Sequence, residues 1–212
     1  MVANGSGERL IPLVRILLGL VYLINGTNWF FKIITPYPSI SDFIHFMPPP
    51  DIVGAMIEHG ILFHLAKGME VVGGLMLLTN RFVPLALVLS MPVTVTVFIV
   101  DVFKPEFRLR AFLMGSGSMV MNTTLLLAYY HHYRPMLAWR AQAQADPSVA
   151  HPTEGGAVAD GVGALARVVQ PMLLGLSVLL GTVMLAWLLV MIGQYAADPK
   201  AISDVKTLVP RK

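Results

Sequence analysis

The chain has 212 residues, of which 56% are hydrophobic and 13% are charged, and its mean hydropathy is +0.70. Soluble domains carry about 25% charged residues, so this composition excludes an ordinary soluble protein and predicts an integral membrane protein. The net charge of +3 does not indicate nucleic-acid binding, because the basic residues are scattered through short loops and tails. Cysteine is absent, which excludes disulfides, thiolate catalysis and redox chemistry by a protein dithiol.

Several apolar stretches reach the length of about 20 helical residues that crosses a bilayer, so we predict an all-α, polytopic membrane protein. The first four predicted helices are expected to form a transmembrane four-helix bundle within residues 1–133. A composition rich in Ala, Gly, Gln, Asp and Pro predicts a flexible linker over 134–167. An additional fifth transmembrane helix is predicted at 168–195, before a polar tail at 196–212. In chain order the expected helices cover 10–31, 51–78, 82–103, 111–130 and 168–195.

Local signals set several of these boundaries. Asp51 follows three prolines and is a good N-cap, at which the second helix is expected to begin. If that helix runs unbroken to Leu78, it is longer than the bilayer requires and must tilt or project. Residues 79–81 predict a tight turn into the third helix, where the interior Pro92 is expected to produce a kink. The fifth helix has almost no polar group at its centre, so we expect it at the edge of the bundle, against lipid.

Lys67 and Glu70 stand three residues apart near the middle of the apolar run 61–79. On insertion scales, each charge near the bilayer midplane costs roughly 2.5 to 3.5 kcal/mol. A chain keeps such a pair where the two groups satisfy each other, line a polar cavity or perform chemistry. We therefore predict that both side chains face other protein segments and are the candidate catalytic groups. The alternative is that they only neutralise each other.

Helical spacing places other polar residues on shared faces. In the first helix, Arg15, Gly19, Tyr22 and Gly26 recur at steps of four, three and four, so a neighbouring backbone can approach the two glycines. We expect the polar faces of the first, second and fourth helices to converge on one interior, although Arg15 can instead reach the lipid headgroups. No metal site is expected. The candidate substrate-binding residues are Arg15, Tyr22, Asn25, His64, Arg81 and Asn122.

Two motifs carry a family resemblance. The second helix and the turn after it read Lys67-x2-Glu70-x2-Gly73-Gly74-x2-Leu77-Leu78-x2-Arg81-x2-Pro84-x-Ala86. The first helix reads Leu13-Val14-Arg15-Ile16-Leu17-Leu18-Gly19, followed by Asn25-Gly26. Over about residues 10–130 this pattern resembles the DoxX family of small membrane proteins. The resemblance implies a four-helix membrane bundle whose polar family positions are matched by Arg15, Lys67, Glu70 and Arg81. The linker and the fifth helix depart from the family pattern.

The relatives implied by this resemblance include the large subunit of a thiosulfate:quinone oxidoreductase and a component of a membrane redox-stress complex. The leading hypothesis is therefore a quinone-linked redox subunit or accessory of the bacterial cell (inner) membrane. A quinone needs an apolar slot, hydrogen-bond donors and a proton route. Lys67, His64 and Tyr22 are the candidate donors, Glu70 is the candidate proton carrier, and Arg15 or Arg81 is a candidate to hold an anionic co-substrate.

No residue of the chain can carry electrons once thiols are absent, so no redox cofactor is expected to be intrinsic. A flavin or metal would come from a partner redox subunit, or two small substrates would react directly in the pocket. One alternative is a non-enzymatic assembly protein, since other relatives are linked to assembly or trafficking. A third hypothesis is transport of a small anion, for which five helices would require a homo-oligomer. Membrane lipid is expected to surround the chain in every case.

Overall fold

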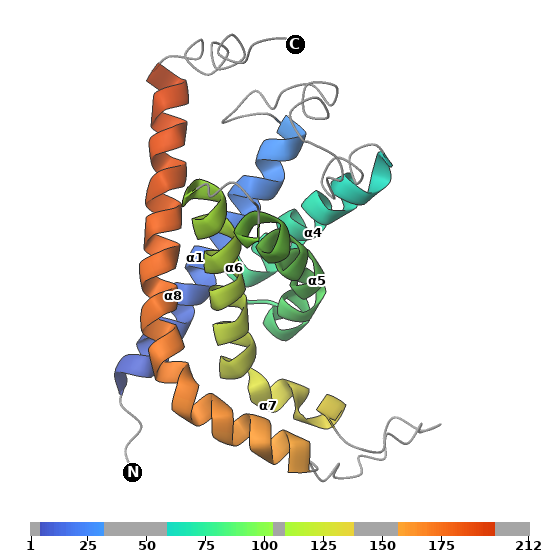
Figure 1. The fold of residues 1–212 in the computed structure, drawn as a ribbon, viewed down its shortest axis with the longest axis vertical. Helices are drawn as coiled ribbons and strands as arrows, with labels where there is room; N and C mark the ends of the chain where they lie inside the picture. Colours follow the sequence, from blue (N-terminus) through green and yellow to red (C-terminus); the bar gives the residue numbers. More distant parts are fainter. Residues whose placement is uncertain (1–4, 32–58, 104–108, 138–156, 198–212) are drawn as a thin grey trace.

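The computed structural model describes residues 5–31, 59–103, 109–137 and 157–197 (Figure 1). All regular structure within these ranges is helical. The helices are α1 (Gly5–Phe31), α4 (Ile61–Leu78), α5 (Val83–Val102), α6 (Leu109–Ala128), α7 (Tyr130–Tyr133), the 3₁₀ helix η1 (Arg134–Leu137) and α8 (Ala157–Ala197). Within the described ranges five of them (α1, α4, α5, α6 and α8) are long and apolar enough to cross a membrane. The protein is an all-α integral membrane protein.

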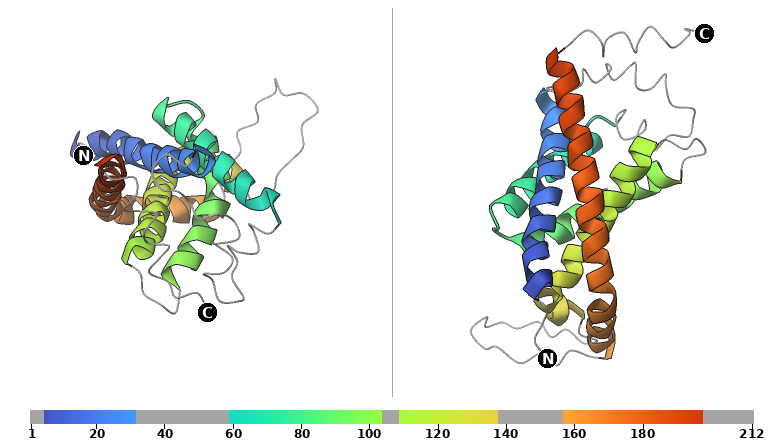
Figure 2. Two further views of the ribbon diagram at one scale, coloured as in Figure 1. Left: turned by 90° about the horizontal axis from the view of Figure 1, so that it is seen from above. Right: turned by 90° about the vertical axis from the view of Figure 1, so that its left-hand side faces the viewer.

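Four of these helices form a bundle, and α8 lies against its outside. In the bundle, α4 packs against α1 and α5, while α6 packs against α5 and α1. α8 contacts α1 and α6, and Figure 2 shows it running alongside α1. The four-helix architecture with one additional helix is therefore confirmed. Its core consists of fully buried apolar side chains, including Leu18, Leu77, Leu87, Met121 and Leu125.

The second membrane helix begins later than predicted. α4 starts at Ile61, and the residue before it, Gly60, has a φ of 78°. This positive φ is accessible to glycine, which has no Cβ, and it cannot continue a right-handed helix. A single helix that runs unbroken from Asp51 to Leu78 is therefore excluded. Residues 51–58, including the predicted N-cap, lie outside the described ranges, as does the segment 32–50.

The predicted turn between the second and third helices is confirmed. Asn80 has a φ of 56°, and its N–H donates to the carbonyl of Leu77 at 3.3 Å. The next N–H, from Arg81, donates to the carbonyl of Met76 at 3.0 Å. This pair of bonds is a Schellman motif, which satisfies carbonyls at a helix end and reverses the chain. It brings α5 back against α4.

The fifth membrane helix is longer than predicted. α8 spans Ala157–Ala197, so the last part of the predicted linker, 157–167, is helical, while its first residues, 134–137, form η1. The linker prediction is therefore wrong at both ends, and 138–156 lie outside the described ranges. Packing explains the added helix, because Ala166 is buried and Arg134 of η1 pairs with Asp160 at 3.1 Å. Figure 1 shows α8 bent, and Pro171 lies inside it.

The exposure of α8 agrees with the expected position at the edge of the bundle. Val168, Met172 and Leu179 are 78%, 69% and 61% exposed. However, α8 does contribute a polar contact to the interior. Ser177 is fully buried, and its Oγ lies 2.7 Å from the Oγ1 of Thr124 on α6. This hydroxyl pair joins the additional helix to the bundle.

Tyr133, at the end of α7, provides a pH-dependent contact outside the membrane spans. Its hydroxyl donates to the carbonyl of Pro84 at 2.9 Å. Burial, with a smaller contribution from Tyr129, raises the pKa of Tyr133 from 10.0 to about 12. The folded state thus holds this proton more tightly than the unfolded state, so the stabilisation is complete below pH 10 and is lost as the pH rises through about 12.

We expect the ultraviolet titration of folded protein to contain a tyrosinate that forms about two pH units late, and Tyr133→Phe to remove it. In denaturant, the titration curve of the wild-type chain should contain one more tyrosine than that of the variant, and this tyrosine should titrate at its ordinary pKa. A variant whose folded titration still contains the same late component would show that Tyr133 is not its source.

Candidate functional site

α1 and α4 run antiparallel and approach each other at backbone contact. A Cβ added at Gly26 would lie 2.9 Å from the carbonyl oxygen of Lys67. One added at Gly74 would lie 2.8 Å from the backbone nitrogen of Leu23. Glycine allows this approach because it has no side chain. The prediction that a neighbouring backbone contacts the glycine face of the first helix is confirmed, and α4 is that neighbour.

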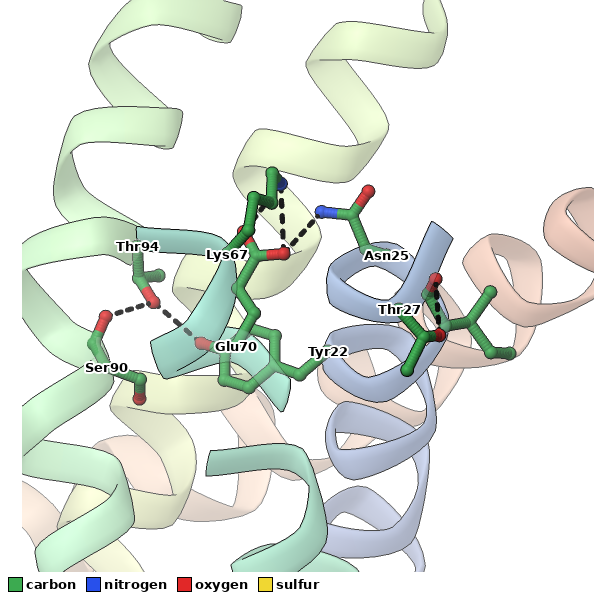
Figure 3. A network of polar contacts seen from close by, with 8 residues as sticks. Tyr22, Asn25, Thr27, Lys67, Glu70, Ser90 and Thr94 are labelled. Carbon is green, nitrogen blue, oxygen red and sulfur yellow. Dashed lines mark hydrogen bonds and ion pairs between the residues drawn. The ribbon is translucent and has the colours of Figure 1, made fainter. Parts of the chain in front are cut away.

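Lys67 and Glu70 form a buried ion pair at this contact (Figure 3). The Nζ of Lys67 lies 2.9 Å from each carboxylate oxygen of Glu70. Asn25 of α1 donates from Nδ2 to the Oε2 of Glu70, also at 2.9 Å. The side chains of Lys67 and Glu70 belong to residues only 7% and 4% exposed, so both face the protein interior as predicted. We call these three residues the ion-pair site.

The ion-pair site is internally balanced in charge but retains capacity for another hydrogen bond. An ammonium has three N–H donors. Within the described ranges, Lys67 contacts the two oxygens of Glu70 and the face of Phe63, whose ring centroid is 5.5 Å from Nζ. Two carboxylate contacts leave at least one N–H of Lys67 for a further acceptor. Lys67 can therefore donate a hydrogen bond to a carbonyl oxygen of a ligand. The carboxyl group of Glu70 lies beside that donor and is a group able to transfer a proton.

Aromatic side chains surround the approach to Lys67. Trp29 of α1 meets Phe63 edge to face at 4.5 Å between centroids, and meets His64 at 5.5 Å. Phe30 lies 6.2 Å from His64 and is 45% exposed. This aromatic cluster of Trp29, Phe30, Phe63 and His64 lies where α1 ends and α4 begins. The cluster places an aromatic surface beside the ion-pair site, and part of that surface is exposed on the outside of the bundle.

His64 belongs to this aromatic cluster and does not contact the ion pair. Its ring is exposed, and Nδ1 lies 2.6 Å from the carbonyl oxygen of Gly60, in the first turn of α4. Within the described ranges, no group of three or more His, Asp or Glu side chains lies close enough to hold a metal ion. The observed role of His64 is therefore contact with the aromatic rings of α1.

A second polar cluster joins α1, α5 and α6. The hydroxyls of Tyr22 and Thr94 are 2.6 Å apart. Asn122, which is fully buried, directs Nδ2 towards the oxygens of Tyr22, Ser90 and Thr94 at 3.1 to 3.2 Å. Its Oδ1 has no hydrogen-bond partner among the described residues. We call these four residues the hydroxyl cluster.

The hydroxyl cluster differs from the expectation that the polar faces of the first, second and fourth helices meet in one interior. The first and fourth membrane helices do meet there, through Tyr22 and Asn122. Their hydroxyl partners, however, come from the third helix, α5, and not from the second. The polar residues of the second helix pair instead with Asn25, one turn away from Tyr22 on α1. The sequence analysis missed Ser90, whose spacing of four residues from Thr94 places both on one face of α5.

The two remaining candidates, Arg15 and Arg81, lie at the other end of α4. Arg15 is 9% exposed and donates from Nη1 to the carbonyl oxygen of Leu77 at 2.5 Å. Arg81 is exposed in the turn that follows α4. Leu77 is seven residues beyond Glu70, about 10 Å along the helix axis. The structure therefore does not bring either arginine together with the ion-pair site.

The comparison with family models gives a match between residues 10–102 and the DoxX model. Comparisons with curated proteins and with solved structures found no match. The matched region contains α4, α5 and α1 from Leu10 onwards, and thus the whole ion-pair site. It ends before α6, so the extension of the resemblance to residue 130 stays a prediction. Over residues 10–102, this integral membrane protein matches the DoxX family.

Proposed function

We propose that this protein is a quinone-linked redox subunit of the bacterial cell membrane, and that the ion-pair site binds the quinone headgroup. The observation that carries the proposal is the environment of Glu70. This carboxyl group lies near the middle of a membrane helix, is 4% exposed, and is held by Lys67 and Asn25. Such intramembrane ionisable residues ordinarily mark ligand sites or proton routes.

The side chains around Glu70 fit the chemistry of a quinone headgroup. A quinone presents carbonyl acceptors on a planar apolar ring, and Lys67 has an N–H beyond those used by Glu70. Phe63 and Trp29 supply aromatic surfaces beside that ammonium. Because Phe30 and His64 of the same aromatic cluster are exposed, a lipid-soluble quinone can approach the site from the bilayer.

Reduction of a quinone to a quinol consumes two electrons and two protons. The chain has no cysteine and no other side chain suited to carry electrons, so we assign the electrons to the redox cofactor, a flavin or metal centre, of a partner subunit. The carboxylate of Glu70 takes up a proton from water and passes it to a reduced quinone oxygen, which restores the ion pair with Lys67 and the hydrogen bond from Asn25. Reprotonation of Glu70 from water allows the second transfer.

Substitution of Glu70 tests this assignment. In membranes that contain the partner subunit, Glu70→Gln should lower the rate of quinone reduction by about 100-fold, the usual contribution of a positioned acid or base. Lys67→Met should lower the amount of quinone that copurifies with the protein, as measured by solvent extraction and chromatography. Arg167→Gln, at an exposed position of α8, also removes one charge, serves as the control and should match the wild type. Absence of bound quinone in the wild type, with unchanged reduction in both variants, would refute the proposal.

A non-enzymatic assembly role is the second candidate. It is favoured by the hydrogen bond from Asn25 of α1 to Glu70 of α4, which together with the Lys67–Glu70 pair gives the ion-pair site a structural use, fixing the register of the two helices. In that case, simultaneous replacement of Lys67 by Met and Glu70 by Leu should leave function intact. Substitutions on the exposed face of α8, such as Leu179→Glu, should then abolish association with a client protein.

A further inference from the structure

Among the side chains that the structure describes, Arg15 and Lys67 are the basic ones buried in the membrane helices of the bundle. Of these two, Lys67 has a carboxylate partner. Arg15 is 9% exposed, and its hydrogen-bond partner within the described ranges is the carbonyl oxygen of Leu77. Among the side chains that the structure describes, no carboxylate lies within ion-pair distance of Arg15. A guanidinium carries five N–H donors, so the single bond to Leu77 uses a small part of its capacity.

The carbonyl of Leu77 cannot neutralise this charge. It lies at the C-terminal end of α4, where aligned peptide dipoles are equivalent to about half a negative charge. Buried cations in membrane helices ordinarily pair with a full negative charge or with several carbonyl groups. The described side chains around Arg15 therefore supply no full negative charge to balance its guanidinium.

The position of Arg15 along α1 limits the kind of anion. The apolar span of α1 begins at Arg9, so the Cα of Arg15 lies about 9 Å inside that end. Side chains on a helix tilt towards its N-terminus, and a long arginine extends further in that direction. The guanidinium thus points towards the end of the bundle that holds the α4–α5 turn, where Arg81 and Asn80 are exposed.

We propose that Arg15 binds a phosphate group at this end of the bundle. The planar fork of a guanidinium matches the paired oxygens of a phosphate, and the C-terminal carbonyl of α4 fixes the orientation of that fork. The phosphate comes from the headgroup of an anionic phospholipid or from the aqueous solution. This site is separate from the ion-pair site, from which it is about 10 Å distant along α4, and it does not depend on quinone chemistry.

Lipid binding to the purified, delipidated protein tests the proposal. Native mass spectrometry would compare phosphatidylglycerol with diacylglycerol of the same acyl chains, and phosphorus NMR would measure binding of inorganic phosphate alone. We expect the protein to bind phosphatidylglycerol more tightly than diacylglycerol. Arg15→Gln should weaken phosphatidylglycerol binding by about 30-fold or more, as expected for loss of one partner of a buried charge pair. Arg9→Gln removes an exposed arginine from the same end of α1 and should change binding by about fivefold at most.

The result with inorganic phosphate distinguishes the two sources. Binding of free phosphate that requires Arg15, without preference between the two lipids, would assign the site to an anion from solution. Wild-type protein that binds neither free phosphate nor phosphatidylglycerol in preference to diacylglycerol would overturn the proposal, and this comparison needs no variant. Arg15→Lys keeps the charge and an N–H donor for the carbonyl of Leu77, so it should fold even where Arg15→Gln does not. It should retain part of the affinity, and full loss with Arg15→Lys in a folded protein would overturn the charge argument.

Discussion

Lys67→Met alone should destabilise the protein by about 3 to 5 kcal/mol, because it leaves the carboxylate of Glu70 buried without its cation. The double variant with Glu70→Leu should recover most of that loss, since apolar side chains of similar volume often replace a buried ion pair without cost. The measurement is equilibrium unfolding in detergent micelles, from which the two single variants and the double variant give a coupling free energy.

The matched control is Met69→Leu, which changes a half-buried residue between the two charged ones and keeps its volume. It should stay within about 1.5 kcal/mol of the wild type. If Lys67→Met is no more damaging than this control, the ion pair does not stabilise the folded bundle. The double variant also separates the two candidate functions. A stable but inactive double variant assigns chemistry to the pair, whereas a stable and active one assigns it a structural role.

The inward position of this pair was predictable, but its third member was not. The cost of placing Lys67 and Glu70 in lipid is a property of the sequence alone, and it requires both to face protein. The contact with Asn25 depends on the axial register between two helices that are far apart in sequence. That register is set where Gly19, Gly26 and Gly74 allow backbone contact, and the sequence shows small residues without showing which helix they meet.

The hydroxyl cluster could not be predicted from the sequence, because the local sequence does not show which Ser and Thr side chains are buried. In membrane helices, Ser and Thr satisfy their hydroxyls on the carbonyl one turn earlier, so they are tolerated on any face. Thr94 donates to the carbonyl of Ser90 at 2.9 Å, and Thr96 donates in the same way to that of Pro92 at 2.8 Å. Thr94 lies in the buried cluster and Thr96 does not. Only the packing of α6 against α5 distinguishes the two.

The start of α8 was missed because alanine and glycine occur both in linkers and in packed helices. At Gly163 an added Cβ would lie 3.2 Å from the ring of Tyr130, so the small residue fits against α7. Such a contact stabilises helix in a segment whose apolar periodicity is weak. The length of the later apolar stretch, by contrast, required a membrane-spanning helix whatever its neighbours, and that part of the prediction held.

Gly74→Ala should destabilise the protein by about 3 kcal/mol and, if the proposed function is right, weaken quinone binding at the same time. The added Cβ would lie 2.8 Å from the nitrogen of Leu23 and 2.9 Å from the carbonyl oxygen of Gly19. Both are backbone atoms of α1, so the steric clash can be relieved only if α1 moves away as a unit. The cost of such overpacking is therefore at the upper end of its usual range of about 1 to 3 kcal/mol. That movement lengthens the 2.9 Å bond between Asn25 and Glu70. Unfolding in micelles and quinone extraction measure the two effects.

Gly73, next to Gly74, supplies an internal control, because its replacement by alanine should not lower the stability. A Cβ at Gly73 meets no atom within 4 Å, and the same is true at Gly68. Alanine is favoured over glycine in a helix by about 0.8 to 1 kcal/mol, so Gly73→Ala and Gly68→Ala should leave stability unchanged or raise it slightly. Equal effects at positions 73 and 74 would mean that helix propensity, and not the contact between α1 and α4, governs the response. A clear difference would show that this backbone contact positions the carboxyl group of Glu70 against α1.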